Sequence, residues 1–277
     1  MLHRVSTVFG NLLSAETDDD LQELAKEIMP MMSEHENNIS LNEELFARIK
    51  AVYEQQDKET LSPEQHKLLE DIYNGFVRNG ANLLGEDKEK YRALCKELSL
   101  LTLQFSENNL KETNDYKLVI TDKSQLAGLP ESAVEAAAEI AGEKGVEGWV
   151  FTLQAPSYGP FLTYADSRDL RRELYMAYNT KCTHDNASNN LEIVKKLANV
   201  RMEIAQLLAM TTSPNTTSRS AWHKTVSPCI SCWTNCWTYT PTAKQEYAEV
   251  QALARQAEGE DFVVMPWDWA YYSHKLE

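Results

Sequence analysis

The chain has 277 residues and a formal net charge of −15, and 43% of its residues are apolar and 25% charged. This length and composition fit one large or two ordinary globular domains. The acidic balance argues against nucleic acid or an anionic membrane as a partner, because both bind clustered Lys and Arg. No apolar stretch is long enough to span a bilayer, and an odd number of cysteines, five, argues against a secreted disulfide framework. We therefore expect a cytoplasmic protein.

Helical patterns dominate the chain. The acidic residues after Thr17 suit the positive end of a helix dipole and predict a helix start. Ser62-Pro63-Glu64-Gln65 predicts a second helix start, with a capping box. Apolar spacings of three and four predict further helices from Lys88 to about Leu110 and from Asn189 to Leu208. The positions expected on the apolar faces of these four helices are Leu21, Leu24, Ile28 and Met31; Leu68, Leu69, Ile72 and Phe76; Tyr91, Leu94, Leu98, Leu101 and Phe105; and Leu191, Val194, Leu197, Ile204 and Leu208.

Strand patterns are few. The segments Tyr116–Ile120 and Trp149–Leu153 are rich in β-branched and aromatic residues, and we expect them to pair as a small ribbon. Leu129-Pro130-Glu131-Ser132 predicts another helix start, and residues 155–160 predict a loop. No internal repeat and no Gly/Ser linker is found. The sequence therefore predicts a mostly α-helical fold, in one continuous body, with a small β-ribbon.

One window differs in composition from the rest of the chain. Residues 204–245 contain no Asp or Glu, although 42 of the 277 residues are acidic, and they hold three of the five cysteines. Cys229, Cys232 and Cys236, with His223 upstream, could be drawn as a zinc site. However, bulky Trp residues separate these cysteines and no Gly lies among them, which is not typical of a structural zinc site. A redox CxxC motif would need a strand-to-helix context, which this stretch does not offer.

The genetic code offers another interpretation of this window. When the last base of each codon is read with the first two of the next, Met210-Thr211 must give Asp and Cys232-Trp233-Thr234 must give Leu then Asp. With allowed codon choices, acids return and Cys and Trp become Leu at helical spacing. We therefore hypothesise that two compensating frame slips bracket roughly residues 209–238 and that this segment is disordered. Sequencing the coding DNA against a close relative tests the idea, and an unbroken frame would refute it.

Five further segments carry a family resemblance. They are Arg4–Phe9, Leu41–Tyr53, Pro156–Asp166, Leu174–Tyr178 and Pro266–Tyr272, and they run the length of the chain. In these segments the chain resembles the thimet-oligopeptidase and peptidyl-dipeptidase family of zinc metallopeptidases, most closely its bacterial peptidyl-dipeptidase branch. The sequence read in the neighbouring frame, a Gly-Tyr segment followed by a Leu-rich helix, is also similar to this family.

The resemblance implies a helical enzyme with two lobes that face a channel in which short peptides are hydrolysed. Zinc in this family is held by two His one helical turn apart and a downstream Glu, with another Glu as general base. The chain has no His-Glu-x-x-His motif, and the nearest string, His35-Glu36-Asn37-Asn38-Ile39, lacks the second His and is expected in a solvated loop. The family places its zinc helix beyond the Pro266–Tyr272 segment, so we expect the chain to lack that helix, together with an N-terminal strip of the family.

These implications give a domain division and a function. Residues 1–208 are expected to be a helical portion of a two-lobed zincin-type oligopeptidase, 209–238 the frame-shifted segment, and 239–277 a return to family-like helical sequence that stops before the zinc helix. The function expected is that of a partial peptidase, inactive alone, whose full-length form uses zinc and binds short peptides. The alternatives are a Cys-rich zinc-binding module, which metal loss on replacing Cys232 would favour, and a helical interaction module or scaffold without chemistry.

No residue of the chain is assigned a catalytic, cofactor-binding or metal-binding role. Cys182 and His184 could form a nucleophile cluster, but two loop residues at this spacing need not face each other. Cys95 is expected to be a small buried hydrophobe, and the aromatic group of Trp267, Trp269, Tyr271 and Tyr272 could line a channel, pack against helices or leave apolar surface exposed. The remaining candidates, expected at the surface or in a groove, are His66, His274, Glu44, Glu54 and Glu70.

Overall fold

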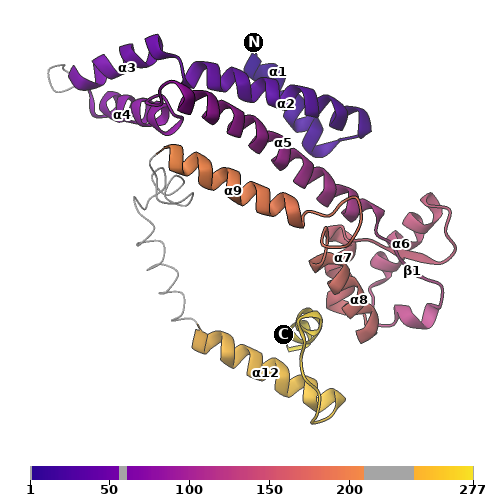
Figure 1. Cartoon of the computed structure of the whole chain (residues 1–277). Coiled ribbons are helices and arrows are strands. Elements are labelled where there is room, and N and C mark those ends of the chain that lie inside the picture. The colour runs from indigo at the N-terminus through magenta and orange to yellow at the C-terminus, as the bar shows by residue number, and fades with distance from the viewer. Residues whose placement is uncertain (1, 56–60, 209–239, 277) are drawn as a thin grey trace. The chain divides into compact units, whose positions relative to one another are not determined.

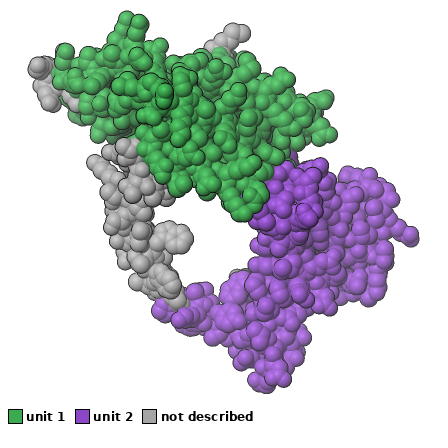
Figure 2. Space-filling model, in the orientation of Figure 1, with its two compact units in different colours: residues 1–107, 192–230 green, residues 108–191, 231–277 purple. Residues whose placement is uncertain are grey.

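The computed structural model of the chain describes residues 2–55, 61–208 and 240–276 (Figure 1). Residues 209–238 lie outside this range, and so do the frame slip, the disorder and the zinc set of Cys229, Cys232, Cys236 and His223 that the sequence suggested there. The chain divides into two compact units (Figure 2) instead of the one continuous body expected. The described part of unit 1 comprises residues 2–55, 61–107 and 192–208, and that of unit 2 comprises residues 108–191 and 240–276.

Unit 1 consists of helices. They are α1 (Leu2–Ala15), α2 (Asp19–Ser40), α3 (Glu43–Gln55), α4 (Pro63–Arg78), α5 (Glu86–Asp115) up to Glu107, and α9 (Leu191–Leu207) from Glu192. In Figure 1 α9 runs beside α5. The contact is a cluster of buried side chains in which Leu94 and Leu101 of α5 meet Ile193, Leu197 and Val200 of α9. Apolar burial between these two long helices therefore forms the core of unit 1.

Both helix starts predicted in this unit are confirmed. The Asp18 carboxylate accepts a hydrogen bond of 2.8 Å from the amide of Leu21 and caps α2. The Ser62 hydroxyl accepts from the amide of Gln65, and the Gln65 side chain accepts from the amide of Ser62 at 2.9 Å. This reciprocal pair satisfies two donors that a helix end otherwise leaves unpaired.

Helix α2 is longer than the sequence predicted. It continues past Pro30 to Ser40 and so includes His35, which was expected in a solvated loop. The loop prediction is wrong because one residue of this polar segment, Asn37, is buried within unit 1 and so packs the segment as part of the helix. His35 and Glu36 themselves are exposed.

The predicted apolar faces are only partly confirmed. In α5, Tyr91, Leu94 and Leu101 are buried, as expected. In α9 the sequence contains two apolar stripes, and α5 packs against the stripe through Ile193, Leu197 and Val200. Exposed positions that were expected on packed faces are Leu24, Met31, Leu68, Ile72, Phe105, Leu191 and Val194. A helical period identifies an apolar stripe but does not say which of two stripes a neighbour covers.

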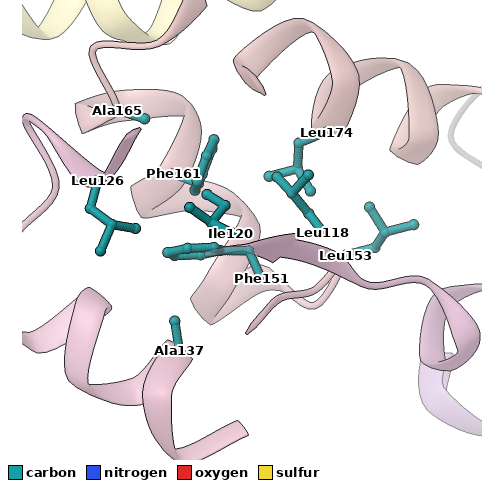
Figure 3. Packing of buried hydrophobic residues seen from close by; sticks show 9 residues of the cluster. All are labelled: Leu118, Ile120, Leu126, Ala137, Phe151, Leu153, Phe161, Ala165 and Leu174. Carbon is teal, nitrogen blue, oxygen red and sulfur yellow. The ribbon is translucent and has the colours of Figure 1, made fainter. Parts of the chain in front are cut away.

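Unit 2 contains the predicted ribbon. Strands β1 (Leu118–Ile120) and β2 (Trp149–Phe151) are antiparallel, with Val119 opposite Val150. The turn η2 (Lys123–Leu126) and helix α6 (Glu131–Glu143) connect them, and α7 (Ala155–Tyr164) and α8 (Arg168–Asn179) follow. Figure 3 shows the buried side chains that gather around the ribbon, with the rings of Phe151 and Phe161 4.6 Å apart between centroids.

Residues 155–160 form the first part of α7 and not the loop that the sequence predicted. Pro156 lies in the first turn, where a helix needs no amide donor. Pro160 lies inside the helix and removes one backbone hydrogen bond, but Phe161 and Leu162 next to it are buried in the core. Their burial outweighs the local proline penalty.

The C-terminal part of unit 2 is a helical hairpin. Helix α12 (Thr240–Glu258), the turn η4 (Pro266–Asp268) and helix α13 (Trp269–Leu276) share a small core of Val250, Ala254, Val264, Tyr271 and Tyr272. Among the described residues, no helix combines the length and the apolar character that crossing a membrane requires.

Candidate functional site

Two buried charges lie at the centre of unit 2. Arg171 of α8 and Asp268 of η4 are 1% and 0% exposed, and Arg171 Nη2 lies 3.0 Å from Asp268 Oδ1. Arg168 binds the same carboxylate with two nitrogens, and its Nη2 lies 2.7 Å from Oδ2. The Met265 amide donates to Oδ2 at 3.0 Å. We call these four groups the Asp268 cluster.

The local sequence explains how the Asp268 cluster forms. Arg168 and Arg171 are three residues apart in the first turn of α8 and so lie on one face of the helix. Pro266 begins the turn η4, and Asp268 at its end reaches back to the Met265 amide. The two arginines can therefore bind the single carboxylate from one side while the backbone of the turn holds it from the other.

The electrostatics of the Asp268 cluster favour a permanently charged carboxylate. Burial by itself raises the pKa of Asp268, but hydrogen bonds from Arg168, the Met265 amide and Arg171 outweigh burial and hold this pKa below its usual value of 3.8. The same hydrogen bond raises the pKa of Arg168. A carboxylate that accepts from four donors and is closed to solvent is not available as a general base.

Aromatic rings surround the Asp268 cluster. The Arg171 guanidinium carbon lies 4.0 Å from the ring centroid of Tyr271, and that of Arg168 lies 4.2 Å from the centroid of Phe262. The Tyr271 hydroxyl donates to Asp166 at 2.7 Å and accepts from Lys275. Burial raises the pKa of Tyr271, and the bond to Asp166 adds to this rise. These contacts tie α13 to α8 and to the end of α7.

Cys182 and His184 make separate contacts in their loop. The Cys182 backbone has a positive φ of 58°, and its amide donates to the Glu112 carboxylate, which also accepts from Asn186 at 3.1 Å. Burial, with Glu112 beside it, raises the pKa of the Cys182 thiol to about 11, and a thiol with a raised pKa is a poor nucleophile. The His184 ring contacts Thr180. The structure therefore supports a structural role for this loop.

The other candidate residues occupy ordinary positions. Cys95 is half-buried, not fully buried as expected, and the polar groups of Tyr91 and Asn37 adjoin its thiol. His66 is partly buried in α4, and the exposed His274 packs edge-on against Tyr164 with centroids 4.9 Å apart. The acids expected at the surface, Glu44, Glu54 and Glu70, are exposed.

The aromatic group at the end of the chain is divided between core and surface. Tyr271 and Tyr272 are buried, so the apolar surface expected near residues 267–272 does not include them. Trp269 is 39% exposed and stacks on Tyr247 of α12 with parallel rings. Trp267 is partly buried and lies near Arg172 and Tyr175.

A zinc site was tested against the side chains present. The six histidines of the sequence include no pair spaced by four residues. Within residues 2–55, 61–208 and 240–276, no group of three or more His, Cys, Asp or Glu is placed to hold a metal ion. The described residues therefore do not fit the zinc site that the resemblance implies.

Sequence reasoning missed the Asp268 cluster. Arg168 and Arg171 look like ordinary surface charges of an amphipathic helix, and Asp268 lies about 100 residues further along the chain. The one local signal was the Pro-Trp-Asp turn, in which an acid follows a proline at the spacing of a capping group.

Comparison with known proteins places this architecture in a family. The model of the family described as Peptidase family M3 matches residues 161–277. The chain is 32% identical to dipeptidyl carboxypeptidase of Escherichia coli (strain K12), with 100% of the chain and 41% of that protein aligned. It is 29% identical to oligopeptidase A of the same organism over 99% of the chain and 41% of that protein.

A plant relative has the same identity over a shorter alignment. The probable cytosolic oligopeptidase A of Arabidopsis thaliana is 32% identical over 75% of the chain and 31% of its own length. The chain thus spans about two fifths of the length of the bacterial relatives. The helical fold agrees with these similarities, and the chain belongs to peptidase family M3, the family of the thimet oligopeptidases and peptidyl-dipeptidases.

Proposed function

We propose that the chain is part of a metallopeptidase that hydrolyses short peptides in the manner of a peptidyl-dipeptidase. The observation that carries this proposal is the 32% identity to a dipeptidyl carboxypeptidase along the whole chain. The match of the family model to residues 161–277, which include the Asp268 cluster, supports it. In this proposal the cluster fixes helices of the peptidase and touches no substrate.

We further propose that the chain is inactive by itself. Peptide hydrolysis by this family needs a metal-bound water and a general base, and the sequence contains no His-Glu-x-x-His motif. In this proposal the zinc ligands and the general base belong to a part of the peptidase that this sequence does not include. Short peptides are the expected ligands of the whole enzyme.

A segment exchange tests the peptidase proposal. The segment of E. coli dipeptidyl carboxypeptidase that aligns with this chain would be replaced by this chain in two versions. One version carries residues 209–238 as they stand, and the other keeps the relative's own residues there. We expect the second version to cleave a quenched short peptide in a zinc-dependent way, because its helices are those of the family.

The two versions also test the frame-slip hypothesis. If the window is frame-shifted, the first version should lose cleavage while the second retains it. A second version that unfolds as cooperatively as the relative but cleaves no peptide would contradict the proposed function. Equal activity of both versions would contradict the frame slip alone.

A further inference from the structure

Two hollows lie on either side of the extended segment between α12 and α13. The first, of about 330 Å³, is lined by Tyr247, Val264, Met265, Pro266 and Trp269. The second, of about 500 Å³, is lined in part by Glu258, Glu260, Asp261 and Arg168. Met265 lines both hollows, so they adjoin at this residue within unit 2, and we call their combined lining the 258–269 surface. Volumes of this size suit a side chain or small ligand.

The first hollow is apolar and has aromatic walls. The rings of Tyr247 and Trp269 are parallel to within 2° and are 42% and 39% exposed. Met265 between the hollows is 38% exposed. Exposed aromatic rings beside Met and Pro favour another aromatic or large apolar side chain, which gains dispersion and apolar burial there.

The second hollow carries negative charge that its own arginine does not neutralise. Arg168, the cation in its wall, is bound by Asp268 at 2.7 Å. Glu258, Glu260 and Asp261 also line this hollow, and Arg168 interacts electrostatically with Glu258 as well as with Asp268. One arginine therefore stands against four carboxylates, which leaves the hollow with net negative charge. A basic group placed there would gain from complementary charge, and an acidic group would be repelled.

The backbone that separates the hollows is held rigidly by side chains. Gln251 binds the Phe262 carbonyl at 2.8 Å and the Val264 amide at 3.0 Å. The Tyr247 hydroxyl donates to the Val264 carbonyl, and Arg168 donates to the Val263 carbonyl at 2.9 Å. A surface that is already ordered loses little conformational entropy when a ligand binds.

From these contacts we infer that the 258–269 surface binds a polypeptide segment that carries an aromatic or large apolar side chain close to a Lys or Arg. The aromatic side chain packs against the exposed parts of the stacked Tyr247 and Trp269 rings, and the basic one lies against Glu260 and Asp261. The complementarity of charge selects a basic-aromatic segment over a purely apolar one. The inference concerns binding alone and does not depend on peptide hydrolysis.

The test measures fluorescence anisotropy of labelled peptides with blocked termini, at low salt, with the whole 277-residue chain. The probes are Gly-Phe-Gly-Lys-Gly, a variant with two glycines between Phe and Lys, and a matched peptide with Glu in place of Lys. We expect at least one Phe–Lys peptide to bind at least roughly tenfold more tightly than the Glu peptide. Mass spectrometry of the recovered peptide shows that binding and not cleavage is measured.

Two matched pairs of variants locate the binding. The double variant Glu260→Lys with Asp261→Lys should weaken binding by roughly tenfold or more, whereas Glu139→Lys with Glu143→Lys, which makes the same charge change on exposed positions of α6, should not. Trp269→Ala should weaken binding similarly, and Leu84→Ala, at a more exposed apolar residue of unit 1, should leave it unchanged. Circular dichroism confirms that each variant is folded.

Three outcomes would overturn the inference. They are no binding of either Phe–Lys peptide up to about 1 mM, equal binding of the Glu peptide, and variants of the 258–269 surface that behave like their controls. Sedimentation velocity adds a fourth, because self-association that Trp269→Ala abolishes would assign the surface to a second copy of the chain. If the chain binds these peptides but the segment exchange gives no peptide cleavage, the proposed function is refuted and this inference stands.

Discussion

At the scale of single residues, Asp268 is the most deeply buried charged side chain among the described residues. Its carboxylate accepts hydrogen bonds from two arginines of α8 and from a backbone amide. Arg171 beside it is almost as deeply buried. Removing one partner of a buried ion pair leaves the other charge uncompensated in a low-dielectric interior, which costs more than the pair itself contributes.

The substitution Asp268→Asn should therefore lower the free energy of unfolding by about 3–5 kcal/mol, because Arg171 keeps its charge without a counterion. Urea denaturation followed by circular dichroism measures the change. The control is Glu70→Gln, which breaks an exposed pair with Lys67 and should have no measurable effect. Equal midpoints for Asp268→Asn and the control would show that the cluster does not stabilise unit 2.

The Asp268 cluster also predicts a pH dependence. The pKa of Asp268 in the folded chain lies below its ordinary value of 3.8, so the carboxylate stabilises the fold fully above that value. This contribution is lost as the pH falls through the folded pKa, because the folded state then binds the proton as well. The stability difference between the wild-type chain and Asp268→Asn should shrink between about pH 5 and about pH 2.5. A difference that stays constant would contradict the assignment.

At the scale of elements, Gly148 sets the geometry at the start of the β-ribbon. Its φ is +105°, and an added Cβ would lie 2.3 Å from the Ile120 carbonyl oxygen. Gly148→Ala should therefore destabilise the chain by about 1–3 kcal/mol. The matched change Gly142→Ala lies in helix α6 with open space around it and should stabilise by about 0.5–1 kcal/mol. Opposite signs in thermal or urea unfolding are the expected result, and the same sign for both would contradict it.

The capping box of α4 gives a second prediction at this scale. Ser62→Ala removes the acceptor for the Gln65 amide and should cost about 1 kcal/mol. Ser132→Ala, at an exposed position in the first turn of α6, is the control and should have a much smaller effect. Chemical denaturation that shows equal effects for the two would mean that the box contributes nothing to stability.

The elements also show how far sequence reasoning reaches. The cap at Ser62 and the ribbon of Leu118–Ile120 with Trp149–Phe151 follow from local chemistry, and both were predicted. Helix α5 was also predicted, but it is longer than expected and runs from Glu86 to Asp115. Helix α7 was missed, because its two prolines suggest a loop and only the burial of Phe161 in a distant core makes it helical. The Asp268 cluster was missed for the same reason, since its partners meet only after folding.

At the scale of the whole molecule, the chain belongs to a family of peptidases, but its described residues include no group suited to a metal ion. The chain belongs to peptidase family M3 and matches bacterial relatives along its length while spanning 41% of theirs. Its described residues form two helical units with separate cores but no group of three or more side chains suited to a metal ion. In our account, the chain supplies structural helices of a peptidase and not its chemistry.

The most direct test is one assay on the purified 277-residue chain, in which cleavage of an internally quenched short peptide is followed with added zinc and the zinc content of the chain is determined in the same sample. We predict that the chain holds no stoichiometric zinc and cleaves no peptide above the buffer rate. Zinc that is lost on Cys232→Ser, without cleavage, would favour a Cys-rich zinc module instead. Stoichiometric zinc together with cleavage that a chelator abolishes would contradict the account.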